Sequence, residues 1–73
     1  MSWSIWIDTP ESSNISRFRY DDVYQILEVE FKNGGVYQYF DVPGGVFDQM
    51  QTALSKGQFL AQNVKGHYRY ARV

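Results

Sequence analysis

The stretch Ile26-Leu-Glu-Val-Glu-Phe-Lys-Asn-Gly-Gly-Val-Tyr-Gln-Tyr-Phe-Asp41 predicts a β-hairpin at the centre of the chain. Apolar and polar side chains alternate through its first half, which is typical of a strand with one buried face. Asn33-Gly34 follows directly, and both residue types tolerate the positive φ angles of tight turns that match strand twist. The second arm of the hairpin then runs from about Val36 to Asp41.

The length of the turn decides where Tyr37 and Tyr39 lie, because a shift of one residue moves every side chain of a strand to the opposite face. If Asn33-Gly34 alone forms the loop, both tyrosines stand on the acidic face of the hairpin as exposed platforms for stacking nucleobases. If Asn33-Gly34-Gly35 forms the loop, Tyr37 pairs with Phe31 and both tyrosines belong to the core. Carboxylates beside exposed rings would repel a phosphate backbone, so we favour the core position.

The chain before the hairpin predicts a strand and an arm. Residues 12–21 enter a short strand through a polar turn. Residues 1–11 alternate apolar side chains until Pro10, which cannot donate a hydrogen bond to a sheet, so this N-terminal arm is either an edge strand or a tail. We therefore divide the chain into an arm, residues 1–11, and a single domain, residues 12–73.

Two helices are predicted after the hairpin. Pro43 suits the first turn of a helix, and apolar residues then recur at helical spacing from Val46 to Leu54. Ser55 and Gln58 have the spacing of a capping box, which predicts a second short helix. Residues 67–73 alternate again and are a candidate extra strand. The predicted fold class is α+β, a three-stranded antiparallel meander packed against two C-terminal helices.

Composition limits the function classes. Seventy-three residues support one small core, for which the aromatic residues, 18% of the chain, supply the apolar surface. The chain has no cysteine and one histidine, which excludes disulfides and the usual zinc sites, and we predict no cofactor or metal. No apolar run approaches the roughly 20 residues that cross a bilayer, and the N-terminus lacks the basic region of a signal peptide. We predict a cytoplasmic protein without a membrane partner.

Charge is distributed unevenly along the chain. Residues 1–48 contain all eight acidic residues and three basic ones, a net charge of −5. Residues 49–73 contain four basic residues and no acidic one, a net charge of +4. The C-terminal third is therefore the place for an anionic partner such as RNA, although four cations also make an ordinary solvated face.

The candidate nucleic-acid site combines the second helix with this basic segment. The N-terminus of a helix offers free backbone N–H groups to a phosphate, and nearby cations add charge. The candidates are Ser55, Lys56, Gly57, Asn63, Lys65, Tyr68, Arg69 and Arg72, with Tyr37 and Tyr39 as stacking residues if they are exposed. The alternative is that Ser55 caps the helix, Gly57 permits close packing and Asn63 satisfies a buried backbone group. His67 lies beside no evident nucleophile or orienting acid, so we predict no enzyme.

The chain resembles the KTSC family, small domains found alone in bacterial proteins and at the C-terminus of some lysyl-tRNA synthetases. The resemblance rests on an ordered set of short motifs: Ser12-Ser13-Asn14-Ile15, Tyr20-Asp21, Leu27, Val29 and Phe31 before Asn33-Gly34, Tyr37-Gln38-Tyr39, Val42-Pro43, Ala53, Ser55-Lys56-Gly57, Phe59, Asn63, Lys65-Gly66 and Tyr68. Met1 to Asp8 extends beyond the family pattern. The resemblance implies an uncharacterised function, with RNA binding suggested by the attachment to synthetases.

A protein partner is the second hypothesis. Trp3 and Trp6 lie in the N-terminal arm, and exposed tryptophans are enriched at the centres of protein interfaces. The arm or an open sheet edge would then dock on another chain, unless the tryptophans close the core. The two hypotheses differ in their response to salt, because only contacts to phosphate weaken steeply with ionic strength.

Overall fold

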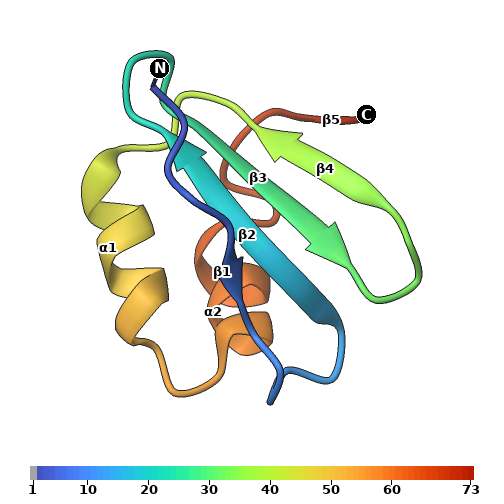
Figure 1. Ribbon diagram of the computed structural model, residues 1–73. Helices are drawn as coiled ribbons and strands as arrows, with labels where there is room; N and C mark the ends of the chain where they lie inside the picture. The colour runs from blue at the N-terminus through green and yellow to red at the C-terminus, as the bar shows by residue number, and fades with distance from the viewer. Residues whose placement is uncertain (1) are drawn as a thin grey trace.

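The computed structural model describes residues 2–73, and it has an α+β architecture, as predicted (Figure 1). The elements are, in chain order, β1 (Ile7–Asp8), β2 (Ile15–Asp21), β3 (Ile26–Phe31), β4 (Val36–Tyr39), α1 (Gly44–Thr52), α2 (Lys56–Asn63) and β5 (Tyr70–Arg72). The strands form one antiparallel sheet in the order β1-β2-β3-β4-β5. The predicted meander is therefore its central part, and the N-terminal arm and the C-terminal segment each add an edge strand.

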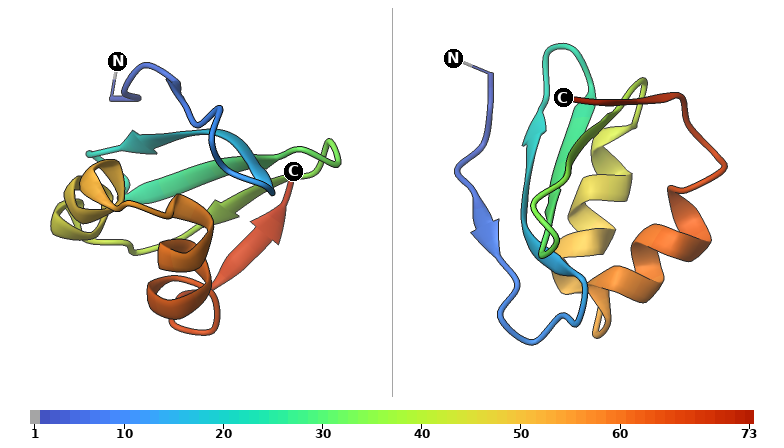
Figure 2. Two further views of the ribbon diagram at one scale, coloured as in Figure 1. Left: turned by 90° about the horizontal axis from the view of Figure 1, so that it is seen from below. Right: turned by 90° about the vertical axis from the view of Figure 1, so that its right-hand side faces the viewer.

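The two helices cover one face of the sheet, and the N-terminal arm runs along the other side (Figure 2). The core lies between the helices and the sheet. A β-bulge between Ile15 and Arg17 adds one residue to β2, so that Ile15 and Phe18 both point into this core although they are three residues apart. The buried hydrophobic side chains are Ile15, Phe18, Tyr20, Leu27, Val29, Tyr39, Val42, Met50, Leu60 and Val64.

The pairing of β3 with β4 corrects the predicted turn. Val29 lies opposite Tyr37, and Leu27 lies opposite Tyr39, so the loop is Lys32-Asn33-Gly34 rather than either of the two loops considered. The backbone N–H of Phe31 donates to the Gly35 carbonyl at 2.8 Å and closes the loop. Because this register differs by two residues from the expected three-residue loop, both tyrosines still face the core, as favoured.

The N-terminal arm is fastened to the sheet as an edge strand, which decides between the strand and the tail. Ile7 pairs with Phe18 in β2, and Trp3 forms an isolated bridge with Asp21. Thr9 is fully buried, and its hydroxyl donates to the Ile15 carbonyl at 2.7 Å. Met1, the first residue of the predicted arm, lies outside the described residues.

Both helices form where the apolar spacing predicts them. Ser55 is the N-cap of α2, and its hydroxyl accepts the backbone N–H of Gln58 at 3.2 Å. Leu54 is the exception, because α1 ends at Thr52 and leaves Leu54 fully exposed in the connection instead of facing the sheet. No helix in residues 2–73 is long and apolar enough to cross a membrane.

Candidate functional site

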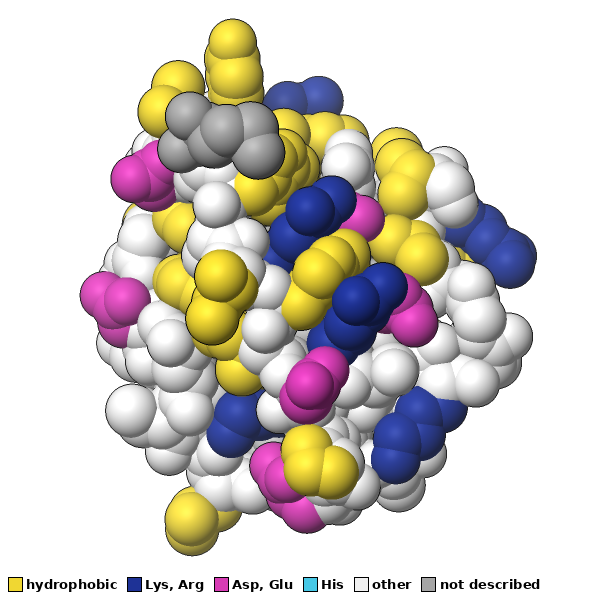
Figure 3. All heavy atoms as spheres, viewed as in Figure 1, with side chains coloured by type: hydrophobic (Ala, Val, Ile, Leu, Met, Phe, Trp, Pro, Cys, Tyr) yellow, Lys and Arg dark blue, Asp and Glu magenta, His cyan; other side chains and the backbone are white. Residues whose placement is uncertain are grey.

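On the outer face of the sheet, opposite the helices, hydrophobic, basic and acidic side chains lie side by side (Figure 3). The guanidinium of Arg17 lies 4.1 Å from the ring centroid of Trp6, and that of Arg19 lies 4.4 Å from both Trp3 and Trp6. We call these four residues the tryptophan–arginine stack. Its tryptophans are half-buried against the sheet and are not the freely exposed anchors of the second hypothesis.

Each arginine of the tryptophan–arginine stack has its own carboxylate. Arg17 Nε donates to Glu30 at 2.9 Å, and Arg19 Nη2 donates to Glu28 at 3.1 Å. Glu28 is 6% exposed, so this second pair is largely removed from water. The two arginines of the stack are thus paired with carboxylates of the same sheet.

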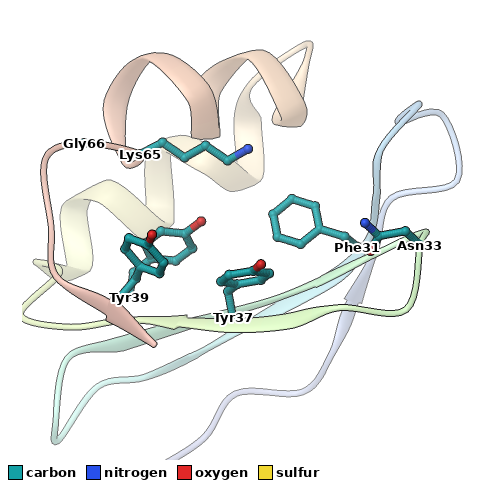
Figure 4. Close-up of a pocket in the computed structure, with 7 residues that line it drawn as sticks. Phe31, Asn33, Tyr37, Tyr39, Lys65 and Gly66 are labelled. Carbon is teal, nitrogen blue, oxygen red and sulfur yellow. The ribbon is translucent and has the colours of Figure 1, made fainter. Parts of the chain in front are cut away.

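The inner face of the sheet has an open cleft at its β4–β5 end. The cleft has a volume of about 410 Å³, and Figure 4 shows its tyrosine and phenylalanine rings rising from the sheet below the side chain of Lys65. Lys65 and Gly66 come from the turn after α2, whereas the rings come from β3, β4 and β5. We call it the aromatic cleft; it is lined by Phe31, Asn33, Tyr37, Tyr39, Lys65, Gly66 and Tyr70.

The rings of the aromatic cleft meet at oblique angles rather than in stacks. Tyr37 and Tyr70 have centroids 5.9 Å apart with planes inclined at 45°, and Tyr39 and Tyr70 are 6.0 Å apart at 38°. Phe31 meets Tyr37 edge to face, at 5.6 Å and 84°. In the core, by contrast, Tyr20 and Phe47 are parallel within 14° at 4.9 Å. Tyr70 therefore does not stack face to face on Tyr37 or on Tyr39.

Two cations border the aromatic cleft. The Lys65 ammonium lies 5.2 Å from the Phe31 ring centroid, and the Arg72 guanidinium lies 5.9 Å from that of Tyr37. Arg72 pairs with Tyr37 across β4 and β5, so its side chain shares the face of the tyrosines. In the described part of the chain, neither cation forms a salt bridge. In the tryptophan–arginine stack, by contrast, each arginine forms a salt bridge with a glutamate.

Tyr39 is the most buried ring of the aromatic cleft, at 3% exposure. Burial, together with the nearby Tyr37 and Tyr70 hydroxyls, raises the pKa of Tyr39 above its ordinary value. Tyr39 therefore stays neutral at physiological pH and forms part of the cleft floor as an uncharged ring.

Comparison with known proteins identifies the family. The model of the KTSC domain family matches residues 11–68. The chain belongs to the KTSC domain family. A KTSC domain protein from Yersinia pestis has a crystal structure with a TM-score of 0.90 to this chain, at 30% identity and with 97% of each chain covered. That coverage reaches into the N-terminal arm, which the family model does not include.

Two kinds of proteins contain similar KTSC sequences. An uncharacterised protein of Stutzerimonas stutzeri is 42% identical over 64 residues, which cover 86% of this chain and 90% of that protein. The lysine–tRNA ligase of Trichormus variabilis is 41% identical over 64 residues, 88% of this chain. This chain spans only about a tenth of the length of that ligase, 11%.

The predicted candidates at the start of α2 are engaged in internal contacts. Ser55 caps the helix, and Lys56 Nζ donates to the Ala53 carbonyl at 3.0 Å. A Cβ at Gly57 would come within 2.4 Å of the Asn14 side-chain oxygen, so Gly57 lets the β1–β2 connection approach the helix. Asn63 Nδ2 donates to the Phe59 carbonyl, one turn back, at 3.2 Å. The contacts of Ser55 and Gly57 fit the structural alternative considered for them, whereas the backbone group that Asn63 binds is exposed and not buried.

The predicted candidates after α2 divide between two places. Lys65 lines the aromatic cleft and Arg72 borders it. Arg69 is elsewhere, because its guanidinium pairs with Asp41 at 3.0 Å and lies 5.5 Å from the Phe40 ring. Tyr68 is half-buried and packs against the core.

The one histidine of the chain lies at the surface. His67 is exposed, and its Nε2 lies 3.1 Å from the Gln62 carbonyl. Residues 2–73 contain no cluster of three or more histidine, cysteine or acidic side chains able to hold a metal. The aromatic cleft, where two exposed cations border aromatic rings, is the candidate site.

Sequence reasoning did not find all residues of the aromatic cleft. Phe31 and Asn33 were predicted only as parts of the hairpin, and Gly66 was named only for the family resemblance. Tyr70 belonged to a segment whose position was left open. The missing information was the pairing of Tyr39 with Tyr70, which brings β5 beside β4. The only sequence signal for it was the alternation of residues 67–73.

Proposed function

We propose that this KTSC domain is a non-catalytic module that binds RNA weakly through the cations of its C-terminal third. The observation that carries the proposal is the pair Lys65 and Arg72, which border aromatic rings and have no carboxylate partner in residues 2–73. Unpaired cations beside aromatic rings are the elements with which proteins hold single-stranded nucleic acids. A cytoplasmic location accords with such a partner.

The structure narrows the basic surface proposed from the sequence. Lys56 is half-buried and bonded to the end of α1, and Arg69 is neutralised by Asp41. Lys65 and Arg72 are exposed and lie on the same side of the molecule as the cleft rings. A contact surface with two free cations gives only a small electrostatic contribution, which is why we expect weak binding.

The relatives support an RNA partner. KTSC sequences similar to this one occur within proteins named lysine–tRNA ligase, of which they make up about a tenth, 11% in Trichormus variabilis and in a Nostoc species. The name lysine–tRNA ligase includes tRNA as a substrate. A small non-catalytic module within such an enzyme would be useful if it increased the affinity for RNA. The aromatic cleft gives this association a physical basis.

The test is a titration of labelled protein with a short single-stranded RNA at two salt concentrations. We expect the double change Lys65→Gln with Arg72→Gln to weaken binding roughly tenfold and to reduce the slope of log affinity against log salt by about 1.4, because two phosphate contacts are lost. Neither side chain is buried, so the variant should fold normally.

Arg69→Gln is the matched control, because it removes one positive charge from the same segment but from an existing ion pair. It should weaken binding less than Arg72→Gln alone. If both arginine variants reduce affinity equally, binding depends on net charge and not on this surface. If the native protein binds no single-stranded RNA at low salt, the proposal is wrong.

A protein partner is the second candidate, and the observation that favours it is the open edge of β5. All three residues of β5 are exposed, and within the described sheet this strand pairs only with β4. An extended peptide could add there as a sixth strand through backbone hydrogen bonds. Such binding would be insensitive to salt and to Lys65→Gln, which separates it from the RNA proposal.

A further inference from the structure

We propose that the aromatic cleft receives one unpaired nucleobase of a single-stranded RNA, and that Lys65 and Arg72 hold the phosphates on either side of that nucleotide. This inference rests on the proposed RNA binding and adds the chemical group that is recognised. It assigns the rings of the cleft to the base and its two cations to the strand.

The geometry of the rings indicates a flat ligand. The ring of Tyr70 is inclined by 45° to that of Tyr37 and by 38° to that of Tyr39, so neither pair buries a ring face in a parallel stack. Tyr70 is 63% exposed although it packs beside two other aromatic residues. Exposed ring faces gain free energy when a planar aromatic group stacks on them, and every nucleobase presents such a face.

The size of the cleft limits it to one nucleotide. Its volume of about 410 Å³ lies near the lower end of the roughly 300 to 1,000 Å³ of small-molecule sites. Bases in a duplex are already stacked and cannot enter such a space, whereas the bases of loops and single strands can be turned outward. The occupant is therefore an unpaired base and not a helix.

The polar groups of the cleft match the rest of a nucleotide. None of its lining residues is acidic, and Lys65 and Arg72 approach it from two different elements, the turn after α2 and β5. Asn33 lies beside Phe31, on the same side of the cleft as the Arg72 guanidinium, and its Oδ1 accepts the Gly35 N–H at 2.9 Å. This bond leaves the Asn33 amide nitrogen to donate to an acceptor on the base edge. Anionic groups thus fit beside the cations and a hydrogen-bonding edge fits beside Asn33.

The experiment compares four ligands by titration of the labelled protein at low salt. They are a single-stranded RNA hexamer, an abasic hexamer with the same phosphates and no bases, a fully paired duplex, and adenosine monophosphate. We expect the single strand to bind at least fivefold more tightly than the abasic strand, because one base stack contributes about a fivefold to hundredfold gain. The largest amide shifts should fall at Tyr37, Tyr39 and Tyr70.

The outcomes separate this inference from the proposed function. Equal affinity for the abasic strand and the single strand would overturn the base-binding role and leave phosphate binding intact. Absence of binding to every ligand would overturn both. Tighter binding of the duplex than of the single strand would overturn the inference. If the mononucleotide binds as tightly as the hexamer, the occupant is a free nucleotide, and the strand assigned to Lys65 and Arg72 is wrong.

Tyr70→Leu tests the ring contact directly. The side chain is mostly exposed, so we expect the fold to persist while affinity for the single strand falls at least fivefold and affinity for the abasic strand stays unchanged. Tyr24→Leu is the matched control, since Tyr24 is 72% exposed and lies outside the cleft. Equal affinities of the two variants for the single strand would contradict the assignment. Tyr70→Phe should retain binding, because it keeps the ring.

Discussion

The two faces of the sheet combine the same kinds of side chains with different results. On the outer face, the tryptophan–arginine stack places Arg17 and Arg19 against indole rings, and each arginine also has a glutamate partner. In the aromatic cleft, Lys65 and Arg72 lie near rings with no carboxylate partner in residues 2–73. The cations of the outer face thus have both an aromatic and an anionic partner, whereas in residues 2–73 the cations of the aromatic cleft have only an aromatic one.

This difference teaches that residue types alone do not distinguish a structural cluster from a binding site. A cation stabilised by both a ring and a carboxylate has little to gain from a ligand, because the ligand would have to replace existing contacts. A cation near a ring and without an anion gains a strong hydrogen-bond partner when a phosphate arrives. The comparison therefore predicts stability effects from changes to the outer face and binding effects from changes to the cleft.

The largest effect on stability is expected for Arg19→Ala on the outer face. The guanidinium of Arg19 gives Glu28 two hydrogen bonds, at 3.1 and 3.2 Å, and its loss leaves this buried carboxylate with only a 3.4 Å bond from Gln38. We expect the free energy of unfolding to fall by about 2 to 3 kcal/mol. Urea unfolding followed by circular dichroism measures this change.

The control for that prediction removes both charges. In the double variant Arg19→Met with Glu28→Leu, no ion is left unpaired, so most of the lost stability should return. RNA affinity should be the same in the single variant and in the native protein. A loss of stability below about 0.5 kcal/mol for Arg19→Ala would show that Glu28 is as well hydrated as an ordinary surface carboxylate.

A smaller effect is expected for Trp6→Leu. The indole of Trp6 lies 4.1 Å from the Arg17 guanidinium and 4.4 Å from that of Arg19, so one substitution removes two cation–π contacts and keeps an apolar side chain. We expect a loss of about 1 kcal/mol in thermal or urea unfolding, with RNA affinity unchanged. The stability of the Trp6→Phe variant should lie between that of the native protein and that of Trp6→Leu. A leucine variant as stable as the native protein would mean that the indole contributes only apolar cover.

The smallest expected effect is a loss of stability at alkaline pH, which arises from Tyr39 in the aromatic cleft. Tyr39 has a raised pKa in the folded protein because of its burial and its tyrosine neighbours. Its contribution to stability is therefore complete below the unfolded-state pKa of about 10 and is lost as pH rises through the folded-state pKa. Burial and nearby aspartates raise the pKa of Tyr20 in the same direction.

The measurement is urea unfolding at several pH values between about 8 and 11. The native protein should lose stability at the alkaline end, and Tyr39→Phe should lose less, because phenylalanine does not ionise. Equal pH dependence of the two proteins would assign the whole alkaline loss to Tyr20 and other groups.

The hairpin and both helices could be predicted from the sequence because their signals are local. The alternation before Asn33 and the cap at Ser55 each depend on a few neighbouring residues, and the structure contains both elements. The predicted loop was wrong, because Lys32, Asn33 and Gly34 form it, whereas both predicted loops begin at Asn33. The face of the tyrosines was right because only an odd shift would have moved it.

The aromatic cleft and the stack could not be predicted, because both depend on contacts between distant segments. Tyr70 reaches Tyr39 only after two helices have passed between their strands. Arg19 meets Trp3 because the arm folds along the outer face, and the sequence shows both residues without showing that they touch. Charge composition pointed to residues 49–73 but did not reveal that Arg69 would be paired and Arg72 would not.

The way β5 is attached to the sheet has a consequence for the hydrogen exchange of the strand that carries Tyr70. Every other strand pair in the sheet joins neighbours along the chain, whereas β5 pairs with β4 across the whole helical segment, through three residue pairs. A short exposed strand held by so distant a contact is expected to separate before the central strands do. Its amides should then exchange hydrogen faster than those of β2, β3 and β4, and ligand binding should slow them.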